Sequence, residues 1–100
     1  MTYRIKLLPE VRFDIKEIME WYNEERPGLG KAFYLALKSR LDSIRRYPMH
    51  CQVSYRDLRS ILLDRFPYQV HYKIEETDGL IVVFAITHTS RDPEVWKSKR

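Results

Sequence analysis

The stretch "FPYQVHYKIEETDGLIVVFAITH", Phe66 to His88, decides the fold because two strand patterns lie on either side of one turn signal. In its first half, apolar or aromatic residues alternate with polar ones, which predicts a strand with two different faces. Asp78-Gly79 is typical of a tight hairpin turn, since both residues tolerate positive φ. The second half, "LIVVFAIT", is apolar on both faces. It therefore predicts the central strand of the sheet, antiparallel to the first and covered on both sides.

Two helical patterns precede this hairpin in the chain. The first begins at Pro9, which suits the first turn of a helix, and runs to about Glu25. The second runs from about Leu29 to Arg46, after a break at Pro27-Gly28. Each helix carries an apolar stripe: Val11, Ile15, Ile18 and Tyr22 on the first, and Leu29, Phe33, Ala36, Leu37, Leu41 and Ile44 on the second. A short break between two amphipathic helices predicts an antiparallel helical hairpin. Arg40 lies within the second stripe, where we expect a structural, ion-paired or snorkelling role.

The remaining segments complete one α+β domain over residues 1–100. "TYRIKLL" predicts a first strand, "YPMHCQVSY" a loop and "RDLRSILLD" a further strand. The tail "PEVWKSKR" predicts a short C-terminal turn or helix that packs Trp96 on the sheet. The expected order is β-α-α-β-β-β, with the helical hairpin packed on a mostly antiparallel sheet.

Composition limits the classes of protein that the chain can belong to. The hydrophobic share of 44% is that of an ordinary globular protein. We find neither a signal peptide nor an apolar run of the roughly 20 residues that cross a bilayer. The single cysteine, Cys51, fits a reducing, cytoplasmic compartment. His50 and Cys51 are adjacent, with His71 and His88 elsewhere, which is no familiar ligand spacing, so we expect neither a metal nor a cofactor.

Charge is divided unevenly along the chain, whose net charge is +4. Between Glu10 and Glu25 there are six acidic and two basic residues, whereas between Lys38 and Lys73 there are eight basic and three acidic residues. A basic middle suits an anionic partner, either an acidic protein segment or nucleic acid, although a solvated surface would look the same. The residues that we expect to contact such a partner are Arg45, Arg46, Arg56, Arg59 and Lys73.

A polar cluster follows the last predicted strand in "THTSRDPEVW", Thr87 to Trp96. Because the hairpin strands run in opposite directions, Arg65 should lie at the same end of the sheet as His88 and Arg91. Two arginines suit a phosphate or carboxylate, and a histidine beside them can move a proton near neutral pH. Each residue also has a structural interpretation. Arg65 could pair with Asp64 or Asp57, Arg91 could brace the C-terminal turn, and His88 could be a satisfied structural histidine.

The segments "GLGKAF", "SIRRYP", "RSILLDRFPYQVHYKI" and "ITHTSRDPEVW" resemble, in this order, the RelE/ParE superfamily of toxins from type II toxin–antitoxin modules. The resemblance implies a compact α+β fold and a cognate acidic antitoxin that neutralises the toxin. It also implies a bacterial or archaeal gene pair, often of the plasmid-stabilisation type.

The superfamily has two branches, one that cleaves messenger RNA and one that acts on DNA gyrase. In the nuclease branch the resemblance gives Arg65, His88 and Arg91 catalytic roles. Against that branch, "RDLRSILLD" has no lysine pair, the C-terminal aromatic residue is Trp96, and the helices are long. We therefore expect a ParE-like growth inhibitor acting on gyrase. The alternatives are a RelE-like messenger RNA endoribonuclease and a stand-alone nucleic-acid-binding module.

Overall fold

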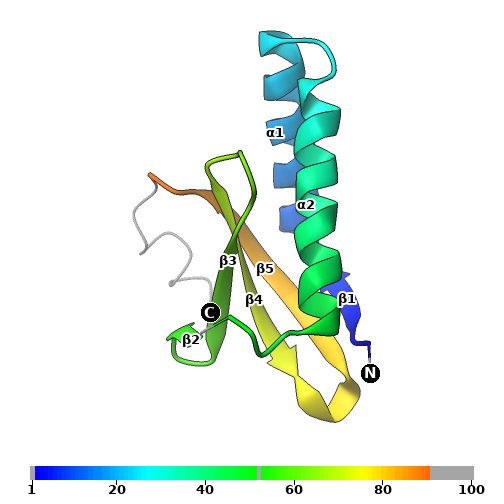
Figure 1. Ribbon diagram of the computed structural model, residues 1–100, viewed down its shortest axis with the longest axis vertical. Coiled ribbons are helices and arrows are strands. Elements are labelled where there is room, and N and C mark those ends of the chain that lie inside the picture. The colour runs from blue at the N-terminus through cyan, green and yellow to red at the C-terminus, as the bar shows by residue number, and fades with distance from the viewer. Residues whose placement is uncertain (1, 52, 91–100) are drawn as a thin grey trace.

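The computed structural model describes residues 2–51 and 53–90, in which two helices pack on one face of a five-stranded sheet (Figure 1). The expected α+β class, with a helical hairpin on a mostly antiparallel sheet, is confirmed. The elements are β1 (Arg4–Leu7), α1 (Pro9–Glu25), α2 (Leu29–Arg46), β2 (Val53–Tyr55), β3 (Leu58–Leu62), β4 (Tyr68–Glu75), the 3-10 turn η1 (Glu76–Asp78) and β5 (Leu80–His88). Both helices have the predicted bounds. Within the described residues, no helix is both long and apolar enough to cross a membrane.

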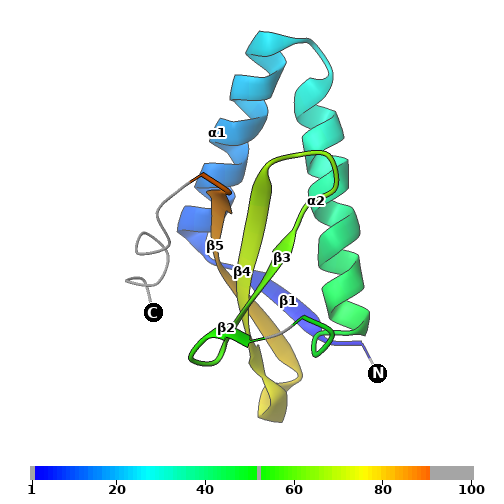
Figure 2. The same cartoon turned by 60° about the vertical axis from the view of Figure 1, so that its left-hand side comes forward.

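The sheet has the strand order β1-β5-β4-β3-β2. Only β1 and β5 pair in parallel, with Arg4 opposite Leu80, and the other neighbours are antiparallel. Figure 2 shows β3 and β4 in front, with the two helices rising behind and above the sheet. β5 is an interior strand that is buried on both faces, as expected, but β4 rather than β5 is the middle strand of the five.

The two helices approach each other closely because of one glycine. A Cβ added at Gly30 would lie 2.5 Å from the backbone oxygen of Met19. The Gly30 amide also donates a hydrogen bond of 2.9 Å to the side-chain oxygen of Asn23. Gly28, just before α2, has φ of 90°, a left-handed conformation that glycine adopts without strain. "GLG" therefore both turns the chain and allows the two helices to touch.

The main core lies between the hairpin and the sheet, where the predicted stripes meet β4 and β5. Its buried members are Val11, Ile15, Phe33, Leu37, Ile44, Leu63, Val70, Tyr72, Ile81, Val83 and Ile86. Leu58, Phe84 and Ala85 form a second cluster. A bulge in β5 explains how Phe84 and Ala85 can share this cluster. Val83 pairs with Tyr72 and Ala85 pairs with His71, which leaves Phe84 as the extra residue.

One predicted loop contains a strand. "YPMHCQVSY" includes β2, which pairs with β3 through a turn at Arg56 and Asp57. Arg56 has φ of 55°, a conformation that glycine or asparagine usually adopts in hairpin turns, so no hairpin signal is present in the sequence here. The predicted C-terminal turn and Trp96 lie outside the described residues.

Candidate functional site

The loop between β3 and β4 presents Arg65 next to the end of β5. Arg65 is exposed and has φ of 67°, an unusual conformation for a residue other than glycine. The Leu63 amide donates to the Tyr68 carbonyl at 3.0 Å, and the Thr89 amide donates to the Pro67 carbonyl at 2.9 Å. The second bond joins this loop to the chain that leaves β5. The structure therefore brings the segments of Arg65 and His88 together, as the hairpin geometry predicted.

His88 is held by its own turn in one tautomer. The Ser90 amide donates to His88 Nδ1 at 3.1 Å, and the Ser90 hydroxyl lies 2.8 Å from the same nitrogen. Because a backbone amide can only donate, Nδ1 is unprotonated in this geometry and the neutral ring carries its proton on Nε2. Nε2 can thus donate a hydrogen bond, but the ring can release or accept a proton there only after the Ser90 amide leaves Nδ1. Arg91, the third predicted residue, lies outside the described residues.

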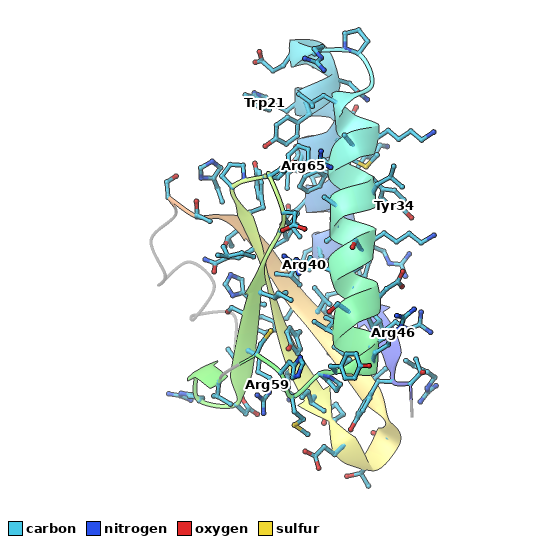
Figure 3. All side chains as sticks on the ribbon, viewed as in Figure 1. Trp21, Tyr34, Arg40, Arg46, Arg59 and Arg65 are labelled. Carbon is cyan, nitrogen blue, oxygen red and sulfur yellow. The ribbon has the colours of Figure 1, made fainter. Side chains whose placement is uncertain are left out.

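Asp64 pairs with Arg40 on α2, so it is engaged by an arginine other than Arg65. Arg40 Nη2 lies 2.8 Å from Asp64 Oδ1, which confirms the structural role expected for Arg40. The pair fixes the β3–β4 loop to the hairpin. Its carboxylate is 75% exposed, so its contribution to the free energy of folding is at most about 1 kcal/mol. Arg40 and Arg65 lie beside the same loop in Figure 3.

A chain of aromatic rings extends from the hairpin to His88. Tyr22 on α1 packs edge-on against Phe66 at 5.1 Å between ring centroids, and Tyr68 packs edge-on against His88 at 5.2 Å. Phe33 lies 5.5 Å from both Phe66 and Tyr68. Burial raises the pKa of Tyr22, with a smaller contribution from Tyr68. These ring contacts connect the region of Arg65 and His88 to the helical hairpin.

The other predicted binding residues come from four parts of the fold: the end of α2, the β2–β3 turn, β3 and β4. Arg45 and Arg46 end α2, and Arg45 is tied to the Tyr3 carbonyl at 3.2 Å and to Asp42 at 3.6 Å. Arg59 donates to the carbonyls of Cys51 and Met49, so it braces the loop after α2.

Lys73 and Arg56 lie on β4 and in the β2–β3 turn. Lys73 pairs with Glu75 on the same strand at 3.3 Å, and Arg56 is exposed in the β2–β3 turn. Arg45, Arg59 and Lys73 therefore have intramolecular partners, which the sequence could not reveal.

Sequence reasoning did not find the buried polar network on β4. His71 is fully buried, with Nδ1 2.7 Å from the Ser60 hydroxyl and Nε2 2.9 Å from the Thr87 hydroxyl. Burial lowers the pKa of His71 to about 4. The ring is therefore neutral near pH 7 and connects three strands. The only sequence signal was its position between the buried Val70 and Tyr72.

The described residues contain no cluster of three or more His, Cys, Asp or Glu side chains that could hold a metal ion. The described part of the candidate site consists of the guanidinium group of Arg65 and the imidazole ring of His88. Such groups can bind an anionic partner or a phosphate.

The fold is that of known toxins. It resembles the chromosomal ParDE system from P. aeruginosa, with a TM-score of 0.76 and 12% identity over 89% of this chain and 98% of that one. It also resembles the isolated E. coli RelE toxin, with a TM-score of 0.68 and 14% identity over 96% of this chain and 94% of that one. The archaeal RelE–RelB complex from Pyrococcus horikoshii OT3 gives a TM-score of 0.62 and 20% identity over 92% and 100%.

The sequence itself identifies the family. Residues 5–93 match the family described as the ParE toxin of the type II toxin–antitoxin system parDE. The chain therefore belongs to the ParE toxin family, which confirms the toxin resemblance. A comparison with curated proteins gives no match.

Proposed function

We propose that this chain is the toxin of a type II toxin–antitoxin module and that it inhibits growth by acting on DNA gyrase in the cytoplasm. The observation that carries this proposal is the match to the ParE family over residues 5–93. The geometry gives two further supports. The helices are long, with 17 and 18 residues, and the closed end of the hairpin projects beyond the sheet (Figure 1).

A second candidate function, messenger RNA cleavage, is favoured by the meeting of Arg65 and His88 at one end of the sheet. In such a reaction Arg65 would stabilise charge on the scissile phosphate. His88 would transfer a proton to or from the ribose 2′-hydroxyl or the leaving oxygen. It could move that proton only if the Ser90 amide first released Nδ1, so the described geometry leaves the reaction without a ready proton carrier. This gap makes gyrase the better-supported target.

Short induction of the chain in growing cells separates the two functions. We expect broken DNA with stable messages, whereas rapid message cleavage with intact chromosomes would contradict the gyrase proposal. Arg65→Ala should relieve growth arrest under either function, while the matched control Lys6→Ala, on β1, should not. His88→Gln distinguishes them further. It should leave DNA breakage nearly unchanged, but it should lower message cleavage about 10²–10⁴-fold if His88 is the acid.

We also propose a cognate acidic antitoxin as the partner. The support is the family together with the excess of basic residues between Lys38 and Lys73. Co-expression with the product of each neighbouring gene, followed by purification of the complex, is the test. We expect one small acidic protein to co-purify and to restore growth, with association that is faster at low salt. If neither neighbour binds or protects, the toxin–antitoxin assignment fails.

A further inference from the structure

The outer face of the hairpin, on the side away from the sheet, exposes large apolar side chains. Phe13 on α1 is 58% exposed and Leu35 on α2 is 54% exposed. Each lies two residues from buried positions, Val11 and Phe33, which turns it about 200° away from the core. Tyr34 is 44% exposed and points away from the sheet in Figure 3. No described strand covers this face (Figures 1 and 2).

The two helices carry opposite charge. α1 has six acidic and two basic residues, a net charge of −4, whereas α2 has one acidic and five basic residues, a net charge of +4. The helices pack side by side, yet within the described residues no ion pair joins them. The ion pairs of α2 go to Asp64 in the β3–β4 loop and to Asp42 on α2 itself. The acidic side chains of α1 and the lysines of α2 are therefore available to another molecule.

Contacts within the hairpin fix which residues lie at the same height. Asn23 bonds to Gly30, and the rings of Tyr22 and Phe33 are stacked at 5.7 Å. Because the helices are antiparallel and each side chain leans toward the N-terminus of its own helix, counting away from the ring contact places the side chain of Glu24 at the height of the Lys31 side chain. The same count places Glu17 level with Lys38. These four charged residues are all exposed.

We propose that two copies of the chain pair through this face as a two-fold symmetric dimer, with the symmetry axis parallel to the helices. Rotation about such an axis places α1 of each copy against α2 of the other and keeps every residue at its height. Glu17 then faces Lys38 of the second copy, and Glu24 faces Lys31 of the second copy. An axis across the helices would instead oppose α1 to α1, where like charges repel. The result is an antiparallel four-helix bundle, a common packing of amphipathic helices.

The area of the face fits a weak dimer rather than a permanent one. A helix of 18 residues is about 27 Å long and about 10 Å wide, so two helices offer on the order of 500 Å² per chain. Two copies would bury about 1,000 Å², near the lower limit of specific interfaces. With several exposed charges in the contact, association should weaken as salt rises. This proposal does not depend on the identity of the toxin's target.

Sedimentation of the full chain, produced by cell-free synthesis, tests the dimer. The charge-reversal variants Glu17→Lys and Lys38→Glu should each weaken self-association at least about 10-fold, because each brings like charges together across the axis twice. An equimolar mixture of the two variants should restore a two-chain species, since every contact again joins opposite charges. Glu76→Lys and Lys6→Glu, outside the hairpin, are matched controls that should sediment like the unchanged chain.

Three outcomes would overturn the proposal. The first is a mass of one chain at every concentration up to about 1 mM, the limit of weak association. The second is a dimer that both reversals leave intact. The third is a pair of reversal variants that each lose the dimer but do not recover it when mixed. Circular dichroism of each variant verifies that the helices are intact, so a loss of folding cannot be taken for a loss of contact.

Discussion

Acidification should destabilise the folded chain through His71. In the folded state this ring is fully buried between the hydroxyls of Ser60 and Thr87, and burial lowers its pKa to about 4. In the unfolded chain a histidine has its ordinary pKa of 6.5. Protons therefore bind the unfolded chain first as the pH falls, and they pull the equilibrium toward unfolding.

The sign and the size follow from these two pKa values. Above pH 6.5 the neutral ring is present in both states and the network contributes fully to stability. Between pH 6.5 and about 4 the stability contribution is lost progressively, because only the unfolded chain gains a proton. One pKa unit corresponds to about 1.4 kcal/mol, so the loss should total about 3 kcal/mol by the lower end of this window. This is a large share of the 5–15 kcal/mol that is typical of small domains.

Urea unfolding between about pH 7 and about pH 4.5 measures this loss, and His71→Gln provides the comparison. Glutamine retains hydrogen-bonding groups but does not titrate. The variant should be less stable than the unchanged chain near neutral pH by about 1–3 kcal/mol, yet its stability should vary less with pH. His50→Gln, in the exposed loop after α2, is the matched histidine control. If the free energy of unfolding changed equally with pH in the unchanged chain and in His71→Gln, the reasoning would be refuted.

Three further predictions concern the core. Gly30→Ala should lower the free energy of unfolding by about 1–3 kcal/mol, because its Cβ would press on the Met19 carbonyl; a thermal melt unchanged from the parent would contradict the close helix contact. Leu37→Ala should cost about 2–5 kcal/mol in urea unfolding, since Leu37 is only 2% exposed, and a cost below about 1 kcal/mol would contradict its place in the core. Tyr72→Phe should cost about 1–3 kcal/mol, because the buried hydroxyl donates to the Pro48 carbonyl at 2.9 Å, whereas the exposed control Tyr34→Phe should cost almost nothing.

The approximate bounds of the helices could be predicted because local chemistry marks the start of α1 and the break between the helices. Pro9 starts α1, and Pro27-Gly28 separates it from α2. The apolar stripes then determine which face is buried. β2 could not be predicted in the same way, because its turn depends on Arg56 in a left-handed conformation that arginine seldom adopts. The bulge at Phe84 could not be predicted either, because a strand that is apolar on both faces has no polar–apolar pattern that specifies its register.

For the candidate site, the sequence could predict only which residues lie at the same end of the sheet, because that follows from strand direction. Antiparallel pairing of β4 and β5 was enough to bring Arg65 and His88 to one end of the sheet. The partners of individual side chains depend on register and loop paths, which composition does not specify. Arg59 illustrates the limit. Its charge predicted a binding role, but its hydrogen bond to the Cys51 carbonyl in the loop after α2 could not be predicted from the sequence.

The parallel pairing of β1 with β5 has a consequence for biosynthesis. Arg4 to Leu7 bond to Leu80 to Val83, so β1 cannot form these hydrogen bonds until β5 has been synthesised much later. At about 5–20 residues per second, roughly 4–15 s separate the synthesis of these two segments. During this interval the hairpin can form locally, but only part of the sheet that covers its stripe has been made. A nascent chain thus carries an incompletely covered apolar surface until β5 is complete, and a chain cut short before Leu80 lacks Ile81, Val83 and Ile86 of the core.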